Sequence, residues 1–562
     1  MDDSIAYKDV FKGSKVAYFS MEIGINSDWS TYSGGLGILA GDTVRSAADL
    51  NVSFVAVTLV LKKGYFRQEF TPDGWQIEHP DEWEPEKYLT LLPEQIEIEI
   101  ESRPVKVQAW LHIVESTTGG KVPVVFLDTD LEVNTPEDRE ITSCLYGGDQ
   151  TYRMKQEVVL GIGGLRMLHA LGVEVLKYHL NEGHASFLLL DLLKDFGWDA
   201  NSVRRLCVFT THTPVEAGHD RFPYDLASRI LPSIIPIDII KEYASADVLN
   251  MTRLALNLSG FINGVAKKHG ETTQKMFPGY KIRSITNGIH PHTWAHPASM
   301  ELYDKYLPGW AKEPTLLIRV EVISHEEIWE AHYRAKRELV DYINSNYQRN
   351  FSYDTFTIGF ARRASTYKRH TLLFRDLRRF KRIGKSFPMQ IVFAGKAHPN
   401  DNPGKEMIKE IFSYISKLKN DIKIVYLENY NMEVAKKMVP GVDIWLNTPK
   451  RPMEASGTSG MKAALNGVVN FSVLDGWWVE GCIEGVTGWS IGPFSDEKFS
   501  PQEMEVRERQ DLYGKLEYAI LPMFYEQRDH WIEMMKNSIG KIAIYFNSHR
   551  MMHRYITDAY FK

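Results

Sequence analysis

A lysine beside a glycine-rich turn is the most informative chemical group in the sequence. Lys462 lies in MEASGTSGMKAALNG, between the apolar runs VDIWLN and VVNFSV. The small and hydroxyl residues of this turn let backbone N–H groups approach an anion, ahead of a helix that we expect to begin near Met461. A partly desolvated amine between strands can condense with an aldehyde. Lys462 is therefore a candidate for Schiff-base formation, although spacing alone favours a solvated lysine on a surface helix.

Two further segments have the composition of phosphate-binding loops. SGGLG, residues 33–37, follows the run KVAYFS, so its amides could reach a phosphate or sugar oxygen. ARRASTYKR, residues 361–369, follows the run FTIGFA and carries four cationic groups, whose arginine forks and lysine charges suit phosphate. Glycine-rich turns are often only structural and charge runs are usually solvated, so neither segment is decisive alone.

Polar residues that could line a cleft occur in three short motifs: HLNEGH (179–184), TTHTP (210–214) and TNGIHP (286–291). A single His or Asn at such a place is more often a helix cap or a satisfied core group. The sequence contains no obvious pair of carboxylates of the kind that retaining glycoside hydrolases use. Its three widely separated cysteines exclude a disulfide framework and a CxxC metal site, so we expect no metal.

The elements that position these residues alternate between apolar runs and amphipathic stretches, which is typical of parallel sheets covered by helices. A first α/β unit has its helix at 150–171, and the alternating residues of 65–113 predict antiparallel hairpins inserted in it. The chain changes unit near 286–294, where Gly and Pro interrupt regular structure. The strands expected in the first unit are 15–20, 53–61, 123–128, 175–180 and 207–211, and those in the second are 356–361, 390–395, 422–427, 442–447 and 468–473.

We therefore expect an α/β fold with two Rossmann-like doubly wound domains. Residues 1–287 form the N-terminal domain with its β insertion. Residues 288–562 form the C-terminal domain, which ends in helices, part of which cross back to the first domain. The ligand site is expected in the cleft between the domains, because open α/β sheets bind at the carboxyl ends of their strands.

Composition narrows the function further. The formal net charge of -6 over 562 residues implies no general attraction to nucleic acid or anionic membrane. No apolar stretch approaches a membrane span of roughly 20 residues, and nothing near Met1 reads as a targeting segment. We expect a soluble, cytoplasmic protein whose ligand is neutral or locally neutralised.

The segment EASGTSGMKAALNG resembles the pyridoxal-phosphate lysine motif of the glycogen and α-glucan phosphorylase family, and the other motifs occur in the family's order across most of the chain. The resemblance implies the family's type B glycosyltransferase architecture. It implies that Lys462 carries pyridoxal 5'-phosphate and that the domain around it binds the cofactor. It also implies that DGWQIE, residues 73–78, is architectural. The other cofactor contacts that it implies are Thr458, Ser459, Arg362, Gly34 and Gly35.

The same resemblance implies an activity, which is the phosphorolysis of terminal α-1,4-linked glucose from a glucan to α-glucose 1-phosphate, with retained configuration. The cofactor phosphate is expected to act as acid–base partner of the substrate phosphate. Lys462, Arg363, Lys368 and His212 are the expected catalytic residues, with Arg363 and Lys368 gripping the substrate phosphate. The expected substrate contacts are Gly35, Leu36, Glu182, His212, Asn287, Glu454, Ser456 and Gly457, with the N-terminal domain binding the glucan.

Some features depart from the family's commonest pattern. Many members read LNDTH for LNEGH and GTGNMK for GTSGMK, and have lysine at Arg362, which affects details of sugar and phosphate contacts. SGGLG comes almost at once, as in the shorter bacterial and archaeal branch, so we expect neither phosphorylation nor allosteric control. A homodimer is implied by the family alone. Two alternatives stay open: a nucleotide-sugar glycosyltransferase similar to glycogen synthase, and an inactive glucan-binding protein.

Overall fold

The computed structural model describes residues 7–494 and 499–561, and its contacts group into two compact units. Unit 1 comprises Met1–Phe66, Pro80–Thr286 and Ser548–Lys562, and unit 2 comprises Arg67–His79 and Asn287–Asn547. A single division of the chain near residue 287 would therefore misplace two segments: Arg67–His79, which belongs to unit 2, and Ser548–Lys562, which belongs to unit 1. The parts of the expected domains at residues 1–6, 495–498 and 562 lie outside the described residues. Among the described residues, no helix is both long and apolar enough to cross a membrane.

Unit 1 is built on a nine-stranded mixed sheet with the order β13-β12-β9-β8-β1-β2-β7-β6-β5. The five strands expected from the sequence are confirmed and pair in parallel, because their apolar runs suit burial on both faces. The predicted antiparallel insertion is confirmed too, since β5 and β6 extend the sheet beyond β7. The strands are β1 Val16–Phe19, β2 Phe54–Leu59, β5 Thr90–Ile100, β6 Arg103–Glu115, β7 Lys121–Asp128, β8 Lys177–Asn181, β9 Cys207–Thr210, β12 Phe261–Gly264 and β13 Arg283–Ser284.

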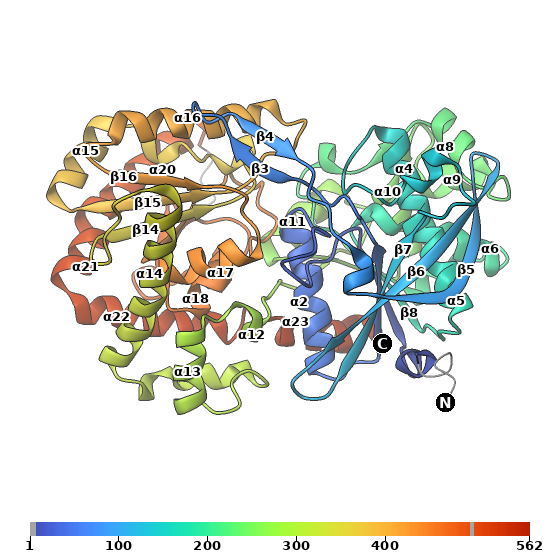
Figure 1. Cartoon of the computed structure of the whole chain (residues 1–562), viewed down its shortest axis with the longest axis horizontal. Coiled ribbons are helices and arrows are strands. Elements are labelled where there is room, and N and C mark those ends of the chain that lie inside the picture. The colour runs from blue at the N-terminus through green and yellow to red at the C-terminus, as the bar shows by residue number, and fades with distance from the viewer. Residues whose placement is uncertain (1–6, 495–498, 562) are drawn as a thin grey trace. The chain divides into compact units, whose positions relative to one another are not determined.

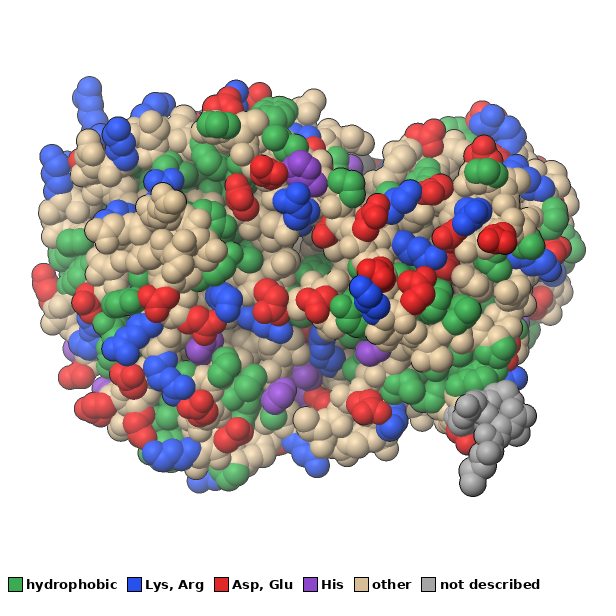
Figure 2. All heavy atoms as spheres, in the orientation of Figure 1, with side chains coloured by type: hydrophobic (Ala, Val, Ile, Leu, Met, Phe, Trp, Pro, Cys, Tyr) green, Lys and Arg blue, Asp and Glu red, His purple; other side chains and the backbone are tan. Residues whose placement is uncertain are grey.

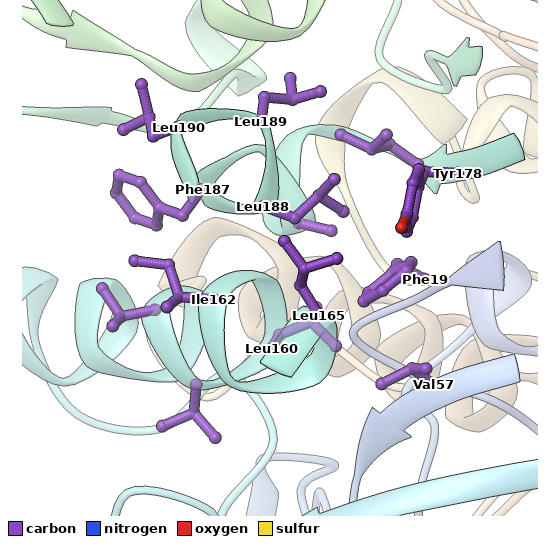
Figure 3. Close-up of a cluster of buried hydrophobic side chains, with 14 of the residues drawn as sticks. Phe19, Val57, Leu160, Ile162, Leu165, Tyr178, Phe187, Leu188, Leu189 and Leu190 are labelled. Carbon is purple, nitrogen blue, oxygen red and sulfur yellow. The ribbon is translucent and has the colours of Figure 1, made fainter. Parts of the chain in front are cut away.

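Buried aliphatic and aromatic side chains fix the helices of unit 1 against this sheet. Phe19 and Val57 of the sheet pack with Leu165 of the helical run that begins at Gln150, as expected from the sequence (Figure 3). Each of these three side chains is fully buried. The run comprises α4 Gln150–Val158, η3 Val159–Gly163 and α5 Gly164–Ala170, and α6 Phe187–Asp195 adds its leucines to the same cluster.

The last helical segment of the chain belongs to unit 1. α23 Ser548–Tyr555 lies beside α2 Gly35–Asp49 and continues into η11 Ile556–Tyr560 (Figure 1). The Tyr560 hydroxyl lies 2.7 Å from His179 Nδ1, and Asn263 Nδ2 donates to the Tyr555 hydroxyl at 3.1 Å. His179 is thus a hydrogen-bonded core residue, and these bonds, together with the burial of Met551, Tyr555 and Tyr560 in the core, join the C-terminal segment to unit 1.

Unit 2 contains a six-stranded sheet with the order β16-β15-β14-β17-β18-β19, in which every pair is parallel. The five expected strands are confirmed within two residues at each end. The strand order reverses between β14 and β17, and loops that follow strands at such a point converge on a common site. The strands are β14 Phe356–Ala361, β15 Met389–Ala394, β16 Lys423–Leu427, β17 Ile444–Asn447, β18 Val469–Val473 and β19 Gly488–Ile491.

A short hairpin, β3 Arg67–Phe70 with β4 Gln76–His79, groups with unit 2 although its neighbours in sequence belong to unit 1. Gln68 Nε2 donates to the Gly395 carbonyl at 2.9 Å, and Gln76 Nε2 donates to the Ala397 carbonyl at 3.0 Å. β4 lies beside α16 Asn402–Leu418 (Figure 1), and Lys405 of this helix pairs with Glu78 of β4 at 2.7 Å. Buried amide hydrogen bonds thus give DGWQIE an architectural role.

Over the face in view in Figure 2, acidic and basic side chains are interspersed.

Candidate functional site

Lys462 is buried in unit 2, in a helix that begins two residues earlier than the sequence indicated. This helix, α18 Ser459–Leu465, follows the loop after β17 and has Thr458 as its N-cap. The Lys462 side chain is 8% exposed, and its Nζ lies 3.4 Å from the centroid of the Trp294 ring. The amine is therefore buried against an aromatic ring rather than placed on an exposed polar surface, which fits a candidate for condensation with an aldehyde.

The last residues of the motif hold this helix in place. Asn466 Nδ2 donates to the carbonyls of Trp294 and Lys462 at 2.8 and 2.9 Å, so it ties α18 to the loop that carries the ring. A side chain at position 460 would meet Asn470 Oδ1 at 2.3 Å, and Asn470 Nδ2 donates to the Gly460 carbonyl at 2.9 Å. Glycine is therefore required at 460 by close packing of the helix against β18.

Polar atoms near the motif fit a bound polar cofactor. Asn447 ends β17 and Ser456 lies in the following loop, and both side chains are buried. Within the described residues, Asn447 Oδ1 and Ser456 Oγ have no hydrogen-bond partner. Because buried polar atoms are nearly always satisfied, a ligand with donors and acceptors would account for them. The Ser459 hydroxyl accepts a bond from Trp445 Nε1 at 3.0 Å, which positions the start of the helix.

The basic loop after β14 meets the loop after β17 at a single carboxylate. Arg362 Nη2 and Lys368 Nζ each donate to Glu454 Oε2 at 2.6 Å. Burial favours the neutral acid, but the charges of Arg362 and Lys368 outweigh it and lower the pKa of Glu454 to about 2. A side chain at Gly457 would lie 3.4 Å from Glu454 Oε1, so Gly457 borders the same cluster. Unit 2 thus brings these four predicted residues together.

Arg363 differs from its neighbours in this loop. Its side chain is exposed, and it makes no ion pair with any of the described residues. Arg362 and Lys368 are buried in the Glu454 cluster, so the two residues predicted to grip phosphate, Arg363 and Lys368, lie in different surroundings. The five N–H donors of the Arg363 guanidinium are therefore accessible to a ligand.

A second buried carboxylate, Asp475, holds the main chain of Glu454. Asp475 Oδ2 accepts from Glu454 N at 2.9 Å, and Oδ1 accepts from Gly476 N at 2.9 Å. Burial, opposed by the bond from Glu454 N, raises the pKa of Asp475 to about 7. Because both oxygens of Asp475 bind backbone N–H groups, Glu454 and Asp475 do not present a pair of carboxylates to one substrate as retaining hydrolases do.

The raised pKa of Asp475 predicts a pH dependence of stability. Its ordinary pKa is 3.8, so between about pH 4 and pH 7 the folded protein binds a proton that the unfolded chain has lost. The contribution of Asp475 to the free energy of unfolding therefore falls as the pH rises through this window. Above about pH 7 the buried carboxylate is charged, and its full destabilising effect is present. As the pH rises from 5 to 8, the free energy of unfolding of Asp475→Asn should therefore increase relative to that of the wild type, measured by urea unfolding at each pH. Parallel pH profiles for the two proteins would contradict this assignment.

In unit 1, the glycine-rich turn SGGLG packs on a buried glutamate that the sequence did not single out. α2 begins at Gly35 with Gly34 as N-cap, and Glu22 Oε2 accepts from Ser33 N at 2.6 Å and Gly34 N at 3.3 Å. The Tyr146 hydroxyl donates to Glu22 Oε1 at 2.8 Å. Side chains added at Gly34 or Gly35 would meet no atom within 4 Å. The backbone at the start of α2 is therefore approachable.

Glu182 and His212 form a second group in unit 1, after β8 and β9. The Glu182 carboxylate accepts from His212 N at 2.7 Å and from the Thr213 hydroxyl at 3.0 Å, and burial raises its pKa. Glu182 has a φ of 73°, a strained backbone conformation that tends to cluster at functional sites. Burial lowers the pKa of His212 to about 3, so the ring is neutral at pH 7. His212 Nε2 lies 2.6 Å from Asn181 Oδ1, which orients the ring.

The predicted residues thus divide between the two units, with Gly34, Gly35, Leu36, Glu182 and His212 in unit 1 and the remainder in unit 2. Asn287 is buried at the start of unit 2. Sequence reasoning missed Glu22, Trp294 and Asp475. A usable signal existed for Glu22 and Asp475, since both closely follow strands whose carboxyl ends carry functional loops. Trp294 gave no such signal.

Comparison with known proteins gives a consistent result. A sequence model described as carbohydrate phosphorylase matches residues 233–488. Maltodextrin phosphorylase of Thermococcus litoralis is 41% identical over 97% of this chain and 70% of its own length. Glycogen phosphorylase of Mycobacterium tuberculosis is 36% identical, with the same 97% and 70% coverage. Glycogen phosphorylase of Aquifex aeolicus is 33% identical over 99% of this chain and 87% of its own length.

Proposed function

Because the chain belongs to the carbohydrate phosphorylase family, we propose that it is an α-glucan phosphorylase, a glycosyltransferase that moves glucose from an α-1,4-glucan to inorganic phosphate. The observation that carries the proposal is the buried Lys462 amine over Trp294, in the motif shared with the family. The product is α-glucose 1-phosphate. Relatives named maltodextrin and glycogen phosphorylases support a glucan as the sugar donor.

The proposed architecture is that of type B glycosyltransferases, with two Rossmann-like domains. The reversal of strand order in unit 2 and the run of parallel strands in unit 1 support it. The first domain, 1–287, would bind the glucan, and the second, 288–562, would bind the cofactor. The reaction would draw on groups from both.

Pyridoxal 5'-phosphate is the proposed cofactor, held covalently by Lys462, with Thr458, Ser459 and Arg362 about its phosphate and Gly34 and Gly35 as further contacts. The unpartnered Asn447 Oδ1 and Ser456 Oγ support a polar ligand at this place. When bound, the cofactor supplies a phosphate group that can exchange a proton with the substrate phosphate.

The residues of this chain would bind and orient the reactants. Lys368, Arg363 and the Gly35 amide would hold the substrate phosphate against the repulsion of a second anion, which is electrostatic preorganisation. His212 and Asn287 would orient the hydroxymethyl end of the glucose, with Leu36, Glu182, Glu454, Ser456 and Gly457 lining the sugar. Phosphate would attack the face that the glucan leaves, so the configuration is retained. The burial of Lys368 and Lys462 supports a site from which competing water would be excluded.

Arg363→Ala should weaken the use of phosphate much more than the use of glucan. We expect the KM for phosphate to rise roughly 10-fold or more, because a charge-assisted contact worth about 1.5–3 kcal/mol is lost, with the KM for maltodextrin within about 2-fold. Arg378→Ala is a matched control, since Arg378 is also an exposed arginine of unit 2. Equal losses for phosphate and glucan would argue against this role of Arg363.

The activity itself is tested by incubating the purified protein with maltodextrin and inorganic phosphate. Release of glucose 1-phosphate that depends on both substrates is expected, together with a pyridoxyl group on Lys462 after borohydride reduction. Consumption of UDP- or ADP-glucose without bound pyridoxal would instead identify a nucleotide-sugar transferase. The cytoplasmic location and the homodimer stay predictions, and sedimentation tests the latter.

A further inference from the structure

Glu454 is the shared anionic partner of two cations, one assigned to the cofactor phosphate and one to the substrate phosphate. A single oxygen, Oε2, lies 2.6 Å from both Arg362 Nη2 and Lys368 Nζ. The three side chains are 8–9% exposed, so their charges are weakly screened by solvent and salt. A guanidinium has five N–H donors and an ammonium three, so both cations can also bind a phosphate. Any phosphate that they bind then lies close to the Glu454 carboxylate.

The main chain around Glu454 is held, so the carboxylate cannot easily withdraw. Asp475 accepts the Glu454 N–H, and Trp477 N donates to the Ser456 carbonyl at 3.0 Å. Gly476 packs so closely that a side chain there would lie 2.4 Å from the Ser456 carbonyl oxygen and 3.0 Å from Glu454 Cγ. Hydrogen bonds and close packing thus fix the segments 454–456 and 475–477 against each other.

We propose that Glu454 sets the affinity for inorganic phosphate, as an internal anion that holds Arg362 and Lys368 in place and repels the incoming dianion. The inference rests on the proposed function, in which these cations face phosphates, and adds a role to the predicted sugar contact of Glu454. If phosphate binds weakly before the reaction, Arg362 and Lys368 can interact more strongly with it in the transition state than in the ground state. Such a difference raises kcat.

The test is calorimetric titration of inorganic phosphate into the holoenzyme and its Glu454→Gln variant, without glucan. The amide keeps the shape of the side chain and removes its charge, so the Kd should fall roughly 10-fold. Glu508→Gln is the matched control. Glu508 is also buried and also pairs with two cations, Arg369 at 2.6 Å and Arg451 at 3.4 Å, and its substitution should leave the Kd within about 2-fold.

An unchanged or higher Kd in Glu454→Gln would overturn the inference, as would an equal fall in Glu508→Gln. If Glu454→Gln does not fold, Glu454→Asp replaces it. Its shorter side chain draws the charge back from both cations, so a smaller fall in Kd is expected and a rise would overturn the proposal. A wild type that binds phosphate but releases no glucose 1-phosphate would contradict the proposed function, while the comparison of Kd values would still decide the role of Glu454.

Discussion

Replacing Lys462 with alanine is expected to abolish glucan phosphorolysis, lowering kcat/KM by at least about 10³-fold. The substitution removes the one amine that α18 places over Trp294, and with it the covalent attachment of the cofactor. Activity and the pyridoxyl peptide recovered after borohydride reduction should be lost together. The measurements are glucose 1-phosphate release and peptide mapping on the same preparations.

Lys405→Ala provides the matched control for this substitution. Lys405 is another buried lysine of unit 2, with Nζ 5.9 Å from the Trp75 ring centroid, but it pairs with Glu78. We expect Lys405→Ala to keep the cofactor and most of the activity. Full activity of Lys462→Ala without bound cofactor, or reduction of the label onto Lys405 in the wild type, would reject the assignment of Lys462.

Asp443→Ala should destabilise unit 2 by about 3–5 kcal/mol, because it leaves a buried charge unpaired. Asp443 Oδ2 binds Lys336 Nζ at 2.6 Å and Thr357 N at 2.7 Å, and Oδ1 lies 2.9 Å from His332 Nε2. Burial lowers the pKa of Lys336, and Asp443 opposes this shift. Without Asp443 the ammonium has to lose its proton or draw in water. Differential scanning calorimetry should show the loss as a lower unfolding temperature.

An exposed ion pair of the same unit is the control for Asp443. Glu301 and Arg334 are in contact at 2.7 Å, but their side chains are 63% and 46% exposed. Glu301→Ala should therefore cost less than about 1 kcal/mol, because solvent and salt screen such pairs. If both substitutions had the same small effect, Asp443 would not be the partner that keeps Lys336 charged in the interior.

Most strands could be predicted because buried parallel strands leave a local signal. FTIGFA, residues 356–361, matches β14 at both ends, and the alternating residues near 90–113 became the antiparallel strands β5 and β6. The hairpin at 67–79 was also recognised as β structure. Its grouping with unit 2 was not, because it depends on amide hydrogen bonds from Gln68 and Gln76 to carbonyls more than 300 residues away in sequence.

The sequence by itself determined the chemistry that is present in this protein. The lysine with its glycine-rich turn, the basic loop after one strand and the polar motifs after others are local patterns, and each rests on residue types at fixed spacing. Only the tertiary structure decided which charges meet. Arg362 and Lys368 share Glu454 while Arg363 stays exposed, and Glu22 and Asp475 bind backbone amides. Ion pairing and burial depend on distances between loops that follow different strands, and no local pattern records those distances.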